Sequence, residues 1–189
     1  MGKKRIAIFA SGSGTNAENI FSYFSDNEQV IVDSLWSNKT GAYALVRAEK
    51  FGVKTFVFNR DQFYNSMQIV DTLRKRKVDM IVLAGFLWLI PDNLVKNFTI
   101  INIHPALLPK YGGKGMYGMN VHKAVVENKE IESGISIHYV NENYDEGKLI
   151  FQAKCQVKPG DTPEQVAEKV HALEYEHFPA IIEKILLKH

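Results

Sequence analysis

The chain has 189 residues, with 23 lysines and arginines against 21 aspartates and glutamates, and its formal net charge is +2. This length suits one domain with a sizeable core, and no Pro-, Gly- or Ser-rich stretch or charge block marks a linker. The small net charge excludes a broad electrostatic surface for nucleic acid or an anionic membrane. The single cysteine, Cys155, excludes an internal disulfide and is consistent with a reducing compartment.

No stretch reads as a targeting or membrane segment. The longest apolar run, Met80 to Ile90, is shorter than the roughly 18 residues that a membrane span needs. The basic start from Met1 to Arg5 is followed by too short an apolar stretch for a secretory signal. We therefore expect a cytoplasmic protein.

The first elements predict a strand at residues 6–10, a glycine loop at 11–16 and a helix with Ile20, Phe21 and Phe24 on one side. Backbone N–H groups of such a loop, together with the helix N-terminus, form a natural cradle for phosphate. The Walker A pattern is absent, and the dinucleotide fingerprint fits only partly, because Asn19 replaces its small sixth position. A purely structural tight turn remains the alternative.

Further strands are expected at 30–32 and 53–58, alternating with helices at about 42–51 and 62–76. This alternation predicts an α/β fold with a doubly wound, mostly parallel sheet. The basic run at 74–77 is interpreted as a solvated helix terminus. No acidic residue ends the second strand to bind a ribose hydroxyl, although Asp33 lies close to that end.

Residues 80–84 predict a fully buried strand, and the large apolar residues of 85–90 follow it. Ligands of open α/β folds bind at this carboxyl edge of the sheet. These apolar residues therefore either pack beneath the helix expected after Pro91 or line a pocket for a flat apolar ligand.

Residues 99–104 predict another strand, in which Asn102 is the one polar interruption before His104. Strand periodicity places these two side chains on the same side. His104 is an acid/base candidate because its unperturbed pKa is roughly 6.5. Asn102 can donate a hydrogen bond to an oxyanion. A turn histidine bonded to backbone is the alternative.

The glycine-rich segment 111–118 is a candidate lid, and the helix after it carries Val121, His122 and Val125. Residues 133–140 and 149–157 alternate and predict an antiparallel pair. The loop joining them contains Asp145. A carboxylate beside His104 would hold its ring and favour the imidazolium, whereas most acidic loop residues are simply solvated.

The last helix is expected to begin at a capping box, Thr162 to Gln165, and to run to the neighbourhood of Pro179. Glu174 adjoins its apolar stripe of Val166, Val170, Leu173 and His177, and is either a solvated flank or a ligand for an amine. The six histidines, His189 included, give no i, i+4 metal-ligand pair, so we expect no metal.

Four segments together resemble the folate-dependent phosphoribosylglycinamide formyltransferase family. Residues 11–16 look like its SGxGSN loop, 83–86 like LAGF, 101–110 like LNIHPSLLPK and 145–150 like DxGxxI. The resemblance covers essentially the whole chain. It implies a Rossmann-like formyltransferase fold with an antiparallel C-terminal edge and a long C-terminal helix.

The activity implied by the resemblance is transfer of the formyl group from 10-formyltetrahydrofolate, the cosubstrate, to the glycine amine of glycinamide ribonucleotide (GAR) in purine synthesis. A single domain, 1–189, would bind phosphoribosyl in its N-terminal half and bind folate and catalyse the reaction in its C-terminal half. The expected partners are these small molecules, without nucleic acid or membrane, and the expected state is a monomer or weak homodimer.

Site residues carry over from the resemblance by position. The catalytic trio would be Asn102, His104 and Asp145, with protonated His104 and Asn102 stabilising a tetrahedral oxyanion and Asp145 orienting His104. GAR would contact Gly12, Ser13, Gly14, Thr15, Asn16 and, through its amine, Glu174. The folate would contact Asn102 and the following residues: Arg60, Leu87, Trp88, Leu89, Ile90, Val140, Asn141, Glu142, Asn143 and Tyr144.

Two departures from the family stand out. Trp88 replaces an arginine, which removes a charge near the folate, and segment 111–118 is longer than the usual KYPG. Alternative functions are a formyltetrahydrofolate hydrolase, a formyltransferase acting on another amine, such as methionyl-tRNA formyltransferase, and a non-catalytic phosphosugar-binding module. The hydrolase and the tRNA enzyme carry an additional domain, for which we expect no room in this chain.

Overall fold

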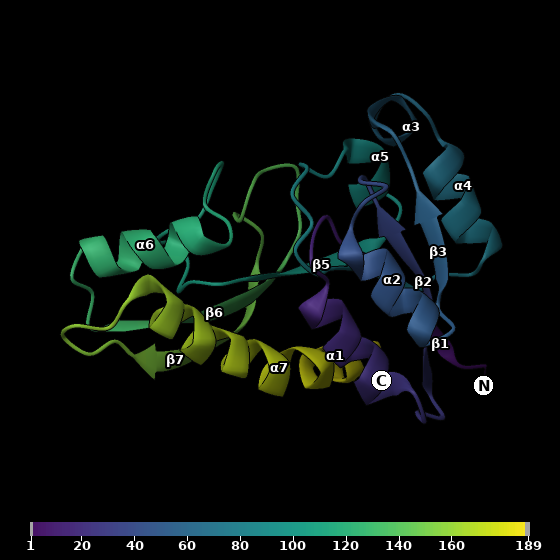
Figure 1. The fold of residues 1–189 in the computed structure, drawn as a ribbon. Helices are drawn as coiled ribbons and strands as arrows, with labels where there is room; N and C mark the ends of the chain where they lie inside the picture. The colour runs from purple at the N-terminus through teal and green to yellow at the C-terminus, as the bar shows by residue number, and fades with distance from the viewer. Residues whose placement is uncertain (1, 188–189) are drawn as a thin grey trace.

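The structure is a computed structural model that describes residues 2–187, so Met1 of the basic start and His189 lie outside the described residues. A seven-stranded sheet in the order β3-β2-β1-β4-β5-β6-β7 runs through it (Figure 1). The first five of these strands are parallel, β6 is antiparallel to β5, and β7 is antiparallel to β6. The strands are β1 (Lys4–Phe9), β2 (Val30–Ser37), β3 (Lys54–Val57), β4 (Met80–Leu83), β5 (Thr99–His104), β6 (Glu132–Tyr139) and β7 (Leu149–Gln156).

Helices cover both faces of the sheet. They are α1 (Thr15–Phe24), α2 (Tyr43–Lys50), α3 (Arg60–Tyr64), α4 (Gln68–Lys75), α5 (Asp92–Val95), α6 (Met119–Glu127) and α7 (Pro163–Leu187). One apolar core lies under α1, α2, α6 and α7, and a second lies under α3, α4 and α5. Alternate residues of β1 enter the two cores, Ile8 the first and Phe9 the second. The predicted doubly wound, mostly parallel sheet with an antiparallel edge and a long C-terminal helix is therefore confirmed.

Burial on both faces explains the continuous apolar runs of β1 and β4. The strand order reverses between these two strands, and Phe9 at the end of β1 pairs with Leu83 at the end of β4. The loops that follow them therefore leave the same edge of the sheet, where open α/β folds bind their ligands. Among residues 2–187, no helix is long and apolar enough to span a membrane.

The single helix expected at 62–76 is wrong, because the chain forms two helices there. Asn59 and Gln62 form a capping box that starts α3 at Arg60, and Asn65 ends it. Ser66 Oγ then accepts a hydrogen bond from Gln68 N at 2.9 Å, at the start of α4. The side chain of Ser66 thus satisfies a backbone group that a continuous helix would have paired.

The expected end of the last helix near Pro179 is also wrong, since α7 continues to Leu187. Proline has no N–H to pair with the carbonyl of Tyr175, four residues earlier. Asn19 Nδ2 on α1 donates to that carbonyl at 3.0 Å instead. At the other end, the predicted capping box is confirmed, because Thr162 N donates to Gln165 Oε1 at 2.8 Å and Gln165 N to Thr162 Oγ1 at 3.3 Å.

The basic run at the end of α4 is not wholly solvated. Arg76 Nε donates to Asp33 Oδ2 at 2.6 Å, and Arg5 also pairs with this buried carboxylate. Burial works against ionisation of Asp33, but hydrogen bonds from Arg76, Ser34 and Arg5 hold its pKa below the usual value. Asp33 is therefore committed to an ion-pair cluster inside the fold, and it does not line the cavity described below.

Candidate active site

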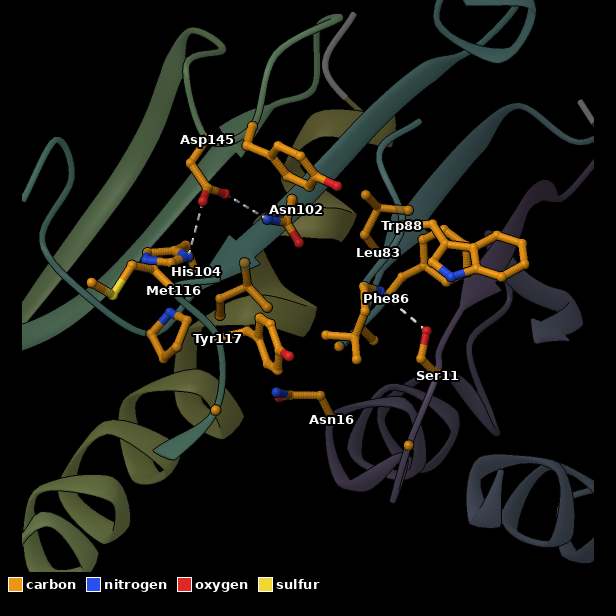
Figure 2. A pocket seen from close by; sticks show the side chains of 18 of the residues that line it. Ser11, Asn16, Leu83, Phe86, Trp88, Asn102, His104, Met116, Tyr117 and Asp145 are labelled. Atoms are coloured by element: carbon orange, nitrogen blue, oxygen red, sulfur yellow. Dashed lines mark hydrogen bonds and ion pairs between the residues drawn. The ribbon is translucent and has the colours of Figure 1, made fainter. Parts of the chain in front are cut away.

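A cavity of about 700 Å³ opens at the carboxyl edge of the sheet. Its walls come from the loops after β1, β4 and β5, the segment before α6, the loop between β6 and β7, and one side of α7 (Figure 2). Every residue expected to bind GAR lines it, as do all three of the expected catalytic trio. Segments far apart in the sequence therefore meet at the predicted edge.

The glycine loop forms one end of this cavity. Gly14 has φ of 75°, and a Cβ at this position would lie 2.5 Å from Ala44 Cβ. Ala44 N also donates to Gly12 O at 3.1 Å, which holds the loop against the start of α2. The loop is thus a tight turn that only glycine fits, and it delivers the N-terminus of α1 to the cavity.

The loop after β4 forms an apolar wall. Phe86 and Trp88 pack against Phe58 and Phe63, with ring centroids 5.5–6.2 Å apart, and both also line the cavity. These residues line a pocket, as one interpretation expected. They also pack beside α3, which is not the helix after Pro91 that the other interpretation expected. Ser11 Oγ fixes the loop by accepting a hydrogen bond from Leu87 N at 3.1 Å.

Asn102, His104 and Asp145 meet in the middle of the cavity (Figure 2). Asp145 Oδ2 lies 3.5 Å from His104 Nδ1, and its Oδ1 lies 3.5 Å from Asn102 Nδ2. Gly113 N donates to Asp145 Oδ2 at 2.9 Å and fixes the carboxylate. The two contacts at 3.5 Å are at the limit of a hydrogen bond, whereas the Gly113 bond is of normal length.

The proton on His104 can be placed from its neighbours. Nε2 lies 2.7 Å from the carbonyl oxygen of Tyr111, which can only accept, so Nε2 carries the hydrogen. Burial lowers the pKa of His104, and the opposing effects of Asp145 and Tyr111 do not offset it. This direction favours a neutral imidazole, in which the lone pair of Nδ1 faces Asp145.

Asp145 is the ionised partner of this pair. Burial works to raise its pKa, but the neighbouring rings of His138 and His104 and the hydrogen bond from Gly113 N together hold it below the usual value. A proton that reached Nδ1 of His104 would lie between the ring and this carboxylate. The arrangement can therefore accept a proton and stabilise the resulting cation.

His138 belongs to the same group, and the sequence did not single it out as a site residue. It is 2% exposed and pairs with Asn102 across β5 and β6, with its Nε2 3.2 Å from Asn102 Nδ2. Its Nδ1 lies 2.8 Å from the carbonyl oxygen of Tyr139 and so carries the hydrogen, which leaves Nε2 to accept from Asn102. His138 thereby orients the amide of Asn102.

Glu174 lies at the other end, beside the glycine loop. It is 3% exposed and its Oε2 accepts hydrogen bonds from Asn16 Nδ2 at 2.9 Å and His171 Nδ1 at 2.7 Å. The interpretation as a solvated flank is therefore wrong. The bond to Glu174 raises the pKa of His171 despite its partial burial. Lys39, His122 and His171 also line the cavity, and the sequence had not marked them as site residues.

Only some of the residues expected to contact folate line the cavity. Arg60, Asn141 and Glu142 do not line the cavity, whereas the other expected residues do: Leu87, Trp88, Leu89, Ile90, Asn102, Val140, Asn143 and Tyr144. The guanidinium of Arg60 lies 5.4 Å from the ring centre of Tyr64 and 5.5 Å from that of Trp88. It therefore stacks on the outer side of the aromatic wall. Within residues 2–187, no three His, Cys, Asp or Glu side chains are grouped as metal ligands.

Comparison with known proteins places these features in a family. The family model described as formyl transferase matches residues 4–182. The chain is 42% identical to the chloroplastic phosphoribosylglycinamide formyltransferase of Arabidopsis thaliana, over 96% of this chain and 66% of that protein, just under two thirds of its length. It is 36% identical to the phosphoribosylglycinamide formyltransferase of Haemophilus influenzae, over 95% of this chain and 85% of that one.

A solved structure is also similar to this chain. The glycinamide ribonucleotide transformylase 1 of Geobacillus kaustophilus superposes with a TM-score of 0.87 at 33% sequence identity, over 97% of this chain and 99% of that one.

Proposed function

The chain belongs to the phosphoribosylglycinamide formyltransferase family, and on this premise we propose that it transfers a formyl group from 10-formyltetrahydrofolate to the glycine amine of GAR. The products are formyl-GAR and tetrahydrofolate, and no metal takes part. One observation carries the proposal. A single cavity joins an anion-binding loop to an apolar aromatic wall, with Asn102, His104 and Asp145 between them.

The phosphoribosyl end of GAR occupies the glycine-loop end of the cavity in this proposal. The loop and the N-terminus of α1 suit its phosphate, because free backbone N–H groups and the helix dipole favour an anion. The contacts that we assign to GAR are Gly12, Ser13, Gly14, Thr15 and Asn16. Glu174 is assigned to the glycine amine, supported by its burial and by its place near His104.

The folate occupies the opposite end. Its flat ring system suits the wall of Leu87 to Ile90 and the loop of Val140, Asn143 and Tyr144, all of which line the cavity. Asn141, Glu142 and Arg60 lie outside the cavity lining, so we assign them to the part of the folate that extends out of it. Arg60, stacked on Trp88, suits the glutamate end because it is a cation at the outer side of this wall.

We assign the proton transfers to His104. When the amine attacks the formyl carbon, a C–N bond forms and the carbonyl oxygen becomes an oxyanion. Nδ1 of the neutral His104 takes the proton that the amine loses, and the imidazolium is stabilised by Asp145, 3.5 Å away. The proton then passes to the departing folate nitrogen, directly or through water, as its bond to carbon breaks.

Asn102 is assigned to the oxyanion. Its amide donates to His138 at 3.2 Å, and its contact with Asp145 at 3.5 Å is the weaker of the two. We expect the N–H of Asn102 in this weaker contact to donate a hydrogen bond to the oxyanion instead. Binding both substrates side by side supplies much of the remaining acceleration, because it removes the entropy cost of their encounter.

Three further assignments complete the proposal. Residues 1–189 form one domain, with phosphoribosyl binding mainly in its N-terminal half and folate binding and catalysis mainly in its C-terminal half. The partners are small molecules only, and the protein is a monomer or weak homodimer. We place it in the cytoplasm, which suits a chain with one cysteine.

The test mixes purified protein with 10-formyltetrahydrofolate, with and without GAR, and follows the release of tetrahydrofolate by absorbance. We expect release only when GAR is present. Release without GAR would favour a formyltetrahydrofolate hydrolase. No release in either mixture, with phosphosugar binding intact, would point to a different acceptor or to a binding module.

A further inference from the structure

His122 is a buried histidine that the reaction described above does not use. It lies on α6, is 1% exposed, and yet lines the cavity. Its Nδ1 is fully buried and has no hydrogen-bond partner among residues 2–187. An unpartnered buried ring nitrogen is uncommon in native proteins because it has lost its bonds to water without replacement. The imidazole therefore requires a partner that the described part of the chain does not supply.

The surroundings of His122 locate that partner near Glu174. The ring centres of His122 and His171 are 6.3 Å apart, and His171 donates to Glu174 at 2.7 Å. Asn16, which donates to the same carboxylate, has its own Oδ1 buried without a partner. Two unpartnered polar atoms and a buried carboxylate thus belong to side chains that line one end of the cavity. A ligand group with several N–H donors would satisfy them.

The charge state of His122 suits such a donor. Burial lowers its pKa to about 4, and the charges of His171 and His104 act in the same direction, whereas Glu174 opposes them. At neutral pH the ring is therefore uncharged and offers one nitrogen lone pair as an acceptor. An uncharged ring does not repel an amine that is partly protonated.

We propose that His122 binds the glycine amine of GAR, accepting one hydrogen bond from it while Glu174 accepts another. This inference rests on the proposed function of the cavity. A neutral primary amine has two N–H groups and one lone pair. Acceptors from α6 and α7 would engage both N–H groups and leave the lone pair directed at the formyl carbon. His122 is thus a second residue that holds and orients the nucleophile.

The test measures GAR binding by calorimetry at pH 7.5 and steady-state kinetics for both substrates. His122→Phe keeps a ring of similar size and removes both nitrogens, and His122→Gln restores a polar acceptor. The matched control is His177→Phe. His177 packs on Phe151 with ring centres 4.9 Å apart and does not line the cavity. Thermal melting shows whether each variant is folded.

We expect His122→Phe to weaken GAR binding by about tenfold or more, and to raise the KM for GAR in proportion, because a bond to a substrate amine is lost. The KM for 10-formyltetrahydrofolate should stay within twofold, His122→Gln should recover part of the loss, and His177→Phe should match the wild type. If His122→Phe does not fold, the same comparison is made with His122→Gln, which should bind GAR more weakly than the wild type.

Unchanged GAR affinity in both His122 variants would overturn this inference while leaving the proposed function intact. Equal losses of GAR and folate affinity would also overturn it, because they would indicate a general disturbance of the cavity. Failure of the wild-type protein to bind GAR would instead refute the proposed function itself.

Discussion

Replacing Asp145 with asparagine removes the negative charge 3.5 Å from His104 Nδ1 and nearly preserves the shape of the side chain. In the proposed reaction that charge stabilises the imidazolium. Opposite charges about 4 Å apart attract by about 4 kcal/mol at an effective dielectric constant of about 20. The side chain is 12% exposed, so some of this is screened by solvent, and about 2–3 kcal/mol should remain. We therefore expect kcat to fall about 30- to 150-fold.

The assay is tetrahydrofolate release at saturating concentrations of both substrates, with each KM measured separately. We expect both KM values to stay within about threefold, because the charge acts on the proton transfer and not on substrate binding. Glu146→Gln is the matched control. It removes an exposed charge from the same loop and keeps the acceptor for Asn143, so its kcat should match the wild type. A normal kcat for Asp145→Asn, or a loss of folate binding alone, would refute the assigned role.

His104→Ala removes the proton acceptor, so kcat should fall about 10²- to 10⁴-fold while GAR binding, measured by calorimetry, survives; loss of binding instead would make His104 a ligand contact. Gly14→Ala places a Cβ 2.5 Å from Ala44 Cβ at a positive φ, and should lower the free energy of unfolding in urea by about 2–4 kcal/mol. Burial lowers the pKa of His122 to about 4, so as the pH falls the unfolded chain takes up a proton at this residue before the folded chain does. The free energy of unfolding is therefore highest above pH 6.5 and decreases as the pH falls toward 4. Between pH 7.5 and 5 this loss is about 2 kcal/mol, and it should be absent from urea titrations of His122→Phe.

The central strands β1 and β4 could be predicted because they are buried on both faces and therefore appear as apolar runs between helical patterns. The sequence did not predict all of the helix boundaries correctly. The capping box of Asn59 and Gln62 was visible in the sequence and should have moved the start of the helix expected at 62–76 to Arg60. The continuation of α7 through Pro179 could not be predicted locally, because the amide that bonds the freed carbonyl comes from Asn19 on another helix.

The residues of the candidate site were likewise predictable only where a local sequence pattern placed them. Strand periodicity placed Asn102 and His104 together, and the loop after β6 brings Asp145 to them. His138 was missed as a site residue because its position depends on the register of β5 and β6, which no local pattern specifies. His122 was missed for a related reason, since a histidine on a helix face looks the same whether it faces a core or a cavity. The roles of these residues remain predictions.

The proposed reaction is a direct transfer of the formyl group between two substrates bound in one cavity. The most direct measurement supplies 10-formyltetrahydrofolate with a ¹³C-labelled formyl carbon together with GAR, and locates the label by mass spectrometry. Direct transfer predicts that the label appears in formyl-GAR in proportion to the tetrahydrofolate released, with none in formate. Label in formate, at a rate that does not depend on GAR, would contradict it.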